Sequence, residues 1–140
     1  MIKECYEILD FIIEQNLTDT VTLELYTNCS VYNLEFINRM LKFKKVNFVM
    51  SIDGTEKTAE YQRHGTNWKV VKNNILKFNS LPISRLFNTA ISGYVLLDVS
   101  SLATFLMELY EQNNEIQTRC YSVSDTDDCH WKYMDTHLRE

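Results

Sequence analysis

The run VNFVMSI, residues 46–52, is almost continuously apolar and has the length of a β-strand. This composition is typical of a strand in a parallel sheet, because the alternation of polar and apolar residues is lost when both faces of a strand are buried. Asp53 and Gly54 follow at once and favour a turn. The run therefore predicts a central strand of an α/β fold.

The segment downstream of this strand predicts a helix. The side chain of Thr66 or Asn67 can accept a hydrogen bond from a backbone N–H group of the first helical turn. Apolar side chains then recur every three or four residues, at Trp68, Val71, Ile75 and Phe78. The only proline, Pro82, lies beyond this pattern, where it cannot disturb the helix.

The same two patterns alternate along the rest of the chain. They predict strands over 21–26, 85–91 and 116–123, and helices over 2–15, from the cap Asn33 onward, and from Asp98 or Ser100 onward. A polar tail begins at about residue 124. Consecutive parallel strands need long crossovers, and the helices supply them. We therefore expect a single α/β domain over 1–140, either a partial (βα) barrel or an open parallel sheet of about four strands, with helices on the outer face and strand order following the sequence.

Charge and hydropathy narrow the classes of protein. The 140 residues include 14 Lys and Arg against 19 Asp and Glu, a net charge of −5, which gives no basic footprint for direct binding to nucleic acid. No apolar run approaches the roughly 18 residues of a membrane span, and the first residues carry acids where a signal peptide has bases. These features predict a cytoplasmic protein without a membrane segment.

The four cysteines are expected to be free thiols, since nothing indicates an oxidising compartment. They are Cys5, Cys29, Cys120 and Cys129. Cys129 and His130, with His137 seven residues on, form the only Cys/His cluster, and its spacing does not match the short ligand pairs of zinc sites. We expect no bound metal there.

Polar residues gather where the predicted strands end. In parallel α/β folds, binding sites collect at the carboxyl ends of strands, and here these ends include Asn28, Ser51 and Asp53. The same residue types also serve as turns and helix caps, which is the structural alternative. Cys29 could be a nucleophile, but the sequence places no base beside it, and His64 alone indicates little.

Residues 43–78 resemble part of the radical S-adenosylmethionine enzymes of the twitch or SPASM type, a group with bacterial and phage versions. In the family a strand ends S-x-D-G, E-Y-x-R-x-G follows, and a helix then contains tryptophan and N-N-I. The corresponding residues here are 51–54, 60–65 and 68–75. The preceding strand ends T-N-G in the family and Thr27-Asn28-Cys29 here.

The resemblance implies a partial barrel of six βα units, of which this chain would hold the third strand onward. It also implies that Ser51, Arg63 and Asn28 correspond to residues that contact the cofactor. The family's C-x-x-x-C-x-x-C loop and G-G-E-P motif do not occur in this sequence. Because such chemistry requires thiolates around an iron–sulfur cluster, we expect no cluster and no catalysis, while residual binding of S-adenosylmethionine is possible.

Three functions follow as hypotheses. The first is a non-catalytic barrel remnant that acts as a binding or inhibitory protein, encoded by a phage or mobile element and directed at a nucleic-acid enzyme such as a CRISPR effector. The second is a partial enzyme completed by a partner chain that carries the cluster. The third is an independent small enzyme or ligand-binding domain, with S-adenosylmethionine as a candidate ligand, that uses Ser51, Asp53 and Arg63, with Cys29 as a further candidate.

The remnant hypothesis also predicts an association. A barrel that starts at its third strand leaves an edge strand unpaired and its inner face open to water. We assign to that face the apolar side chains Leu23, Leu25, Phe48, Met50 and Phe87. We therefore expect a homodimer or a protein partner, unless helix 2–15 closes the opening.

Overall fold

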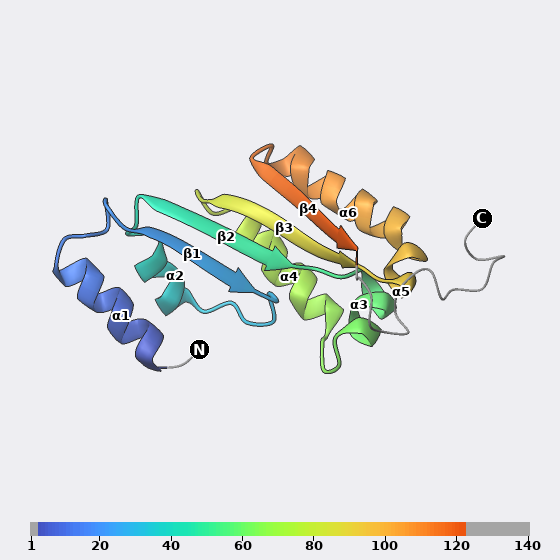
Figure 1. The fold of residues 1–140 in the computed structure, drawn as a ribbon, viewed down its shortest axis with the longest axis horizontal. Helices are drawn as coiled ribbons and strands as arrows, with labels where there is room; N and C mark the ends of the chain where they lie inside the picture. Colours follow the sequence, from blue (N-terminus) through green and yellow to red (C-terminus); the bar gives the residue numbers. More distant parts are fainter. Residues whose placement is uncertain (1–2, 123–140) are drawn as a thin grey trace.

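The structure is a computed structural model that describes residues 3–122, with side chains through Tyr121. Its four strands form one parallel sheet in the order β1-β2-β3-β4, so the predicted α/β fold and strand order are confirmed (Figure 1). The strands are β1 (Thr22–Thr27), β2 (Lys45–Ser51), β3 (Ser84–Ile91) and β4 (Ile116–Ser122).

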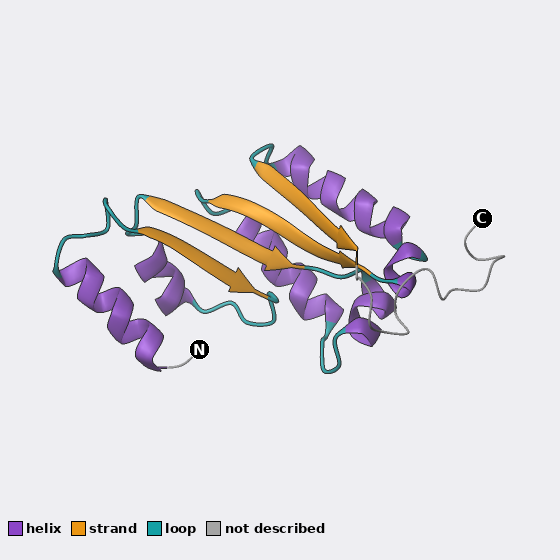
Figure 2. Ribbon diagram, in the orientation of Figure 1, coloured by secondary structure: helices purple, strands orange, loops and turns teal. Residues whose placement is uncertain are grey.

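All the described helices except the first lie between consecutive strands. The helices are α1 (Lys3–Glu14), α2 (Leu34–Met40), α3 (Glu56–Gln62), α4 (Trp68–Asn79), α5 (Gly93–Leu96) and α6 (Val99–Gln112). In Figure 2, α2, α4 and α6 lie behind the sheet, whereas α3 and α5 lie at the carboxyl ends of the strands. The short helices α3 and α5 are not predicted by the sequence patterns.

Two of the predicted helix caps are confirmed and one works differently. The Asn33 side chain accepts from the Phe36 backbone N–H at 3.0 Å, and the Asn67 side chain accepts from the Val70 N–H at 3.2 Å. Asp98 stands at the N-cap position of α6 but makes no hydrogen bond to its own helix. Its carboxylate accepts instead from the backbone N–H of Thr55 at 2.7 Å.

The apolar strand residues face the helices rather than an open interior. Phe48, Met50 and Phe87 are buried in a core shared with α2, α4 and α6, and Leu23 and Leu25 pack against its margin. The prediction that these five side chains line an inner face left open to water is therefore wrong. The physical reason is that the amphipathic helices of the crossovers bury the apolar face of the sheet within one chain.

No described helix covers the opposite face of the sheet, which is largely polar and is called the uncovered face below. Register places Glu24 beside Asn47 and Ser51 beside Asn88 on this face, with exposed Tyr26 next to buried Val49. Within residues 3–122, no helix is both long enough and apolar enough to cross a membrane. The predicted polar tail and the residues Cys129, His130 and His137 lie outside the described residues.

Candidate functional site

The sheet brings Asn28 and Ser51 to the same end of neighbouring strands. Thr27 pairs with Met50 across β1 and β2, so the residues that follow them stand side by side at the carboxyl ends. Ser51 is half-buried on the uncovered face and pairs in register with Asn88 of β3. This part of the predicted site is assembled as parallel topology requires.

Arg63 is bound to an acidic side chain of the chain itself. Its Nε and Nη2 both donate to Oδ2 of Asp53, at 2.8 and 2.5 Å. The other carboxylate oxygen, Oδ1, accepts from the backbone N–H of Ala90 at 2.9 Å. Asp53 therefore connects the end of β2 to β3 and binds the Arg63 guanidinium. Both contacts are structural.

Asn28 is likewise engaged by its own loop. Its Oδ1 accepts from the backbone N–H of Ser30 at 3.1 Å and from the Ser30 hydroxyl at 2.8 Å, an arrangement typical of an Asx turn. The turn places Cys29 in the left-handed region, with φ of 60°. The Cys29 carbonyl accepts from the buried Asn74 side chain at 2.9 Å, which ties the loop to α4.

The Cys29 side chain is not suited to nucleophilic chemistry. It is completely buried, and burial raises the pKa of its thiol to about 12, against a smaller opposing effect of the Arg63 charge. A thiol with this pKa is protonated at neutral pH. His64, the other candidate for acid–base work, is exposed after α3.

One polar group at this end of the sheet was missed by the sequence patterns. The Oδ1 atom of Asn88 is buried and has no hydrogen-bond partner among the described residues. Register places Asn88 between Ser51 and Arg119, so a row of three polar residues crosses β2, β3 and β4 on the uncovered face. The only sequence signal was an asparagine in the middle of the strand, directly after the apolar pair Leu86 and Phe87.

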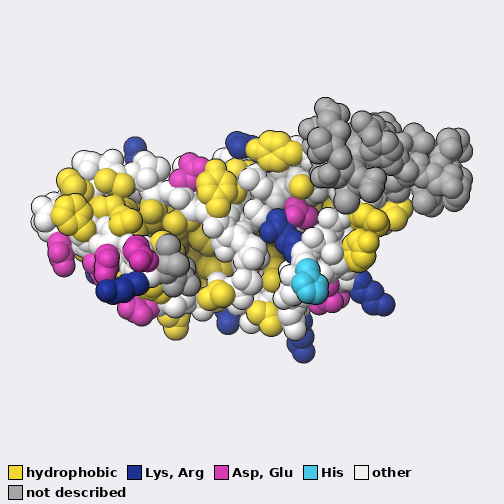
Figure 3. Space-filling model, turned by 60° about the horizontal axis from the view of Figure 1, so that its bottom comes forward, with side chains coloured by type: hydrophobic (Ala, Val, Ile, Leu, Met, Phe, Trp, Pro, Cys, Tyr) yellow, Lys and Arg dark blue, Asp and Glu magenta, His cyan; other side chains and the backbone are white. Residues whose placement is uncertain are grey.

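A second feature lies along β1, where α1 and α2 approach this strand. It is a groove of about 310 Å³ with mainly apolar walls. The side chains that line it include Ile8, Leu9, Leu23, Leu25, Val31 and Phe36. Figure 3 shows hydrophobic side chains gathered in a hollow on this side of the molecule, with acidic side chains nearby.

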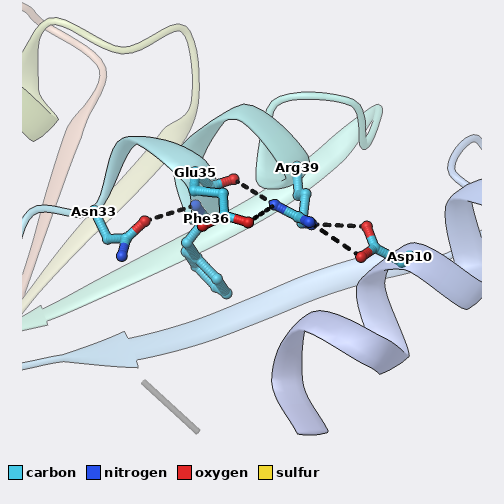
Figure 4. A network of polar contacts seen from close by, with 5 residues as sticks. All are labelled: Asp10, Asn33, Glu35, Phe36 and Arg39. Carbon is cyan, nitrogen blue, oxygen red and sulfur yellow. Dashed lines mark hydrogen bonds and ion pairs between the residues drawn. The ribbon is translucent and has the colours of Figure 1, made fainter. Parts of the chain in front are cut away.

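Arg39 of α2 fixes the position of α1, which forms one wall of this groove. Its Nε and Nη2 donate to the two carboxylate oxygens of Asp10 at 2.7 and 3.1 Å, and its Nη1 donates to Oε1 of Glu35 at 3.0 Å (Figure 4). The guanidinium also lies 5.0 Å from the centre of the Tyr6 ring. The contacts with Asp10 and Tyr6 hold α1 against α2.

No model of a known protein family matches the sequence, and no curated protein matches it. Among residues 3–122, no group of three or more His, Cys, Asp or Glu side chains could hold a metal ion.

Proposed function

We propose that this chain is a non-catalytic binding protein built on a partial barrel of the radical S-adenosylmethionine type. The observation that carries the proposal is the ion pair between Arg63 and Asp53. A cofactor that recruited the Arg63 guanidinium would have to displace two charge-assisted hydrogen bonds from a largely buried carboxylate. Asn28 is similarly occupied by Ser30.

The backbone of Cys29 supports the relationship that underlies the proposal. In the family this position is glycine, which adopts a positive φ without cost. Here cysteine stands in the same place with φ of 60°, a conformation uncommon for residues that carry a side chain. A glycine-like turn that persists without its glycine is what a diverged member of the family would contain.

The exposed apolar surface supports a binding role. Ile8 and Val31, which both line the groove, are each 60% exposed. Large apolar side chains that are grouped on a surface usually mark an interaction site. An inhibitory role against a nucleic-acid enzyme fits the acidic charge of the chain, because such enzymes present basic surfaces. We extend the proposal to that class of partner, a CRISPR effector among them, with a phage or mobile element as the source.

Calorimetric titration with S-adenosylmethionine tests the non-catalytic assignment. We expect no heat of binding from the wild-type protein, and no iron or sulfide after anaerobic purification. Lys69→Ala serves as the control for Arg63→Ala, because it also removes one basic side chain but Lys69 is exposed on α4 and corresponds to no family contact. Binding that Arg63→Ala abolishes and Lys69→Ala preserves would overturn the proposal.

That result would favour a second candidate function, an S-adenosylmethionine-binding domain or partial enzyme completed by another chain. The unpartnered Oδ1 of Asn88, beside Ser51, is the observation that favours it, because a bound ligand could donate to this oxygen. In that case Asn88→Ala should weaken the binding as Arg63→Ala does.

A further inference from the structure

Strand β1 has a free edge beside the apolar groove. Among the described residues it pairs only with β2, and its other side has no strand neighbour. The backbone N–H and C=O groups on an unpaired edge are a template for another strand. The groove, lined by Leu23 and Leu25 of β1 and by Ile8 of α1, opens next to this edge.

Helix α1 has more apolar surface than its contacts within the chain cover. Leu9 is buried, and Tyr6 and Ile13 pack against the core. Ile8 and Phe11, on an adjacent stripe, are each 60% exposed. A helix beneath a sheet normally buries such a stripe against strand side chains, so α1 is placed to support one further strand.

Charge indicates what that strand must carry. The segment over residues 3–40, which forms α1, β1 and α2, contains seven acidic and two basic side chains, and Lys42, Lys44 and Lys45 follow it. Along β1, Leu23 and Leu25 turn toward the helices, while Glu24 is exposed on the uncovered face. A neighbouring strand would therefore place apolar side chains over α1 and a basic side chain beside Glu24.

We propose that the groove between α1 and β1 binds an extended segment of a partner protein, which adds to the sheet as a strand beside β1 and alternates apolar with basic residues. This proposal rests on the proposed binding function and specifies its partner. Backbone hydrogen bonds along β1 provide affinity, and the alternation provides specificity. A second copy of this chain is disfavoured, because it would bring two acidic surfaces together.

The test uses three fluorescent eight-residue peptides and the full chain. One alternates valine with lysine, one alternates valine with glutamate, and one has the composition of the first in blocks of two, which breaks the alternation. By fluorescence anisotropy we expect the alternating valine–lysine peptide to bind, and the other two to bind about tenfold more weakly or not at all. Hydrogen exchange should slow at backbone amides of residues 22–27 when the first peptide is bound.

Matched variants locate the binding surface. Ile8→Glu should weaken binding about tenfold, whereas Met107→Glu should leave it unchanged, since Met107 on α6 is similarly exposed at 64% but far from the groove in the fold. Glu24→Lys should reverse the preference between the lysine and glutamate peptides. Circular dichroism of each variant confirms that the fold is intact.

Several outcomes would overturn the proposal. The first three are no binding of the valine–lysine peptide, equal binding of all three peptides, and equal loss of binding in both glutamate variants. The fourth is binding without protection of residues 22–27, which would indicate that the occupant of the groove is helical or a small molecule. Light scattering tests the last alternative occupant, a second copy of this chain, which the sequence prediction of a homodimer would provide. A particle of twice 16.6 kDa that Ile8→Glu returns to 16.6 kDa would assign the groove to that second copy. The titration with S-adenosylmethionine is independent of every one of these results.

Discussion

Gly54 stands where the chain has room for no side chain. Its φ is +114°, and a Cβ atom there would come within 2.7 Å of Cγ2 of Thr58. The same turn is fixed by Thr55, whose backbone N–H and hydroxyl both donate to Oδ2 of Asp98, at 2.7 and 2.9 Å. The glycine thus allows the end of β2 to meet the start of α6.

We predict that Gly54→Ala lowers the free energy of unfolding by about 1–3 kcal/mol, because alanine adds both backbone strain and a close contact. Gly65→Ala is the control, since Gly65 also has a positive φ, +82°, but nothing lies within 4 Å of the added atom. It should cost only about 1 kcal/mol. Urea denaturation measures both, and equal losses would mean that the contact with Thr58 is relieved by movement.

Cys29 combines a buried thiol with an unusual backbone conformation. Because burial raises its pKa to about 12, less than about one thiol in a thousand is ionised at pH 8. We predict that iodoacetamide modifies the exposed Cys120 in the native protein and leaves Cys29 unmodified. Mass spectrometry of the digested protein measures this, and concentrated urea should make both cysteines react. Modification of native Cys29 at the rate of Cys120 would contradict the structure.

At the scale of elements, α1 depends on a polar contact for its position. The hydrogen bonds from Arg39 lower the pKa of the Asp10 carboxyl below its ordinary value of 3.8. The folded chain therefore loses this proton more readily than the unfolded chain. It follows that the contact stabilises the docked helix above pH 3.8 and is lost as the pH falls below that value.

We predict that Asp10→Asn loosens α1 at neutral pH and removes the change that acid produces in the wild-type protein. Amides of residues 3–14 should exchange faster, and the nuclear Overhauser effect between Tyr6 and Phe36, whose ring centres lie 6.1 Å apart, should weaken. Glu7→Gln is the control, because it breaks an exposed ion pair with Lys3 inside α1 and no contact with α2. Unchanged protection in Asp10→Asn would show that apolar packing alone positions the helix.

At the scale of the whole molecule, one hydrophobic core joins every layer. It runs from Leu9 of α1 through Phe48 and Phe87 of the sheet to Leu109 of α6. A single continuous core usually unfolds as a unit. We therefore expect the described residues to unfold as one domain.

We predict one cooperative unfolding transition in urea. The free energy of unfolding should fall by about 1–3 kcal/mol for each molar increase in urea concentration. The measurement compares far-ultraviolet circular dichroism with the fluorescence of buried Trp68, in a Trp131→Phe background that removes the second tryptophan. The two curves should coincide. An earlier transition that releases α1 alone would show that the groove is formed by a separately unfolding element.

The candidate site shows how far local patterns reach. The sequence placed Asn28 and Ser51 at neighbouring strand ends, because parallel topology follows from the alternation of strands and helices. It could not show that Arg63 pairs with Asp53 or that Ala90 completes that contact, since the three residues come from different elements. Nor could it show the groove, because its walls come from α1, β1 and α2 together.

The four strands and the helices α1, α2, α4 and α6 were determined by the sequence alone. Strands such as residues 46–52 and caps such as Asn33 and Asn67 depend on periodicity and on hydrogen bonds within a few residues. The tertiary structure alone decided which face of each strand is covered, why Leu23 and Leu25 turn toward the helices, and where α3 and α5 form. These features depend on packing between segments far apart in the chain, and a pattern within one segment carries no information about its distant neighbours.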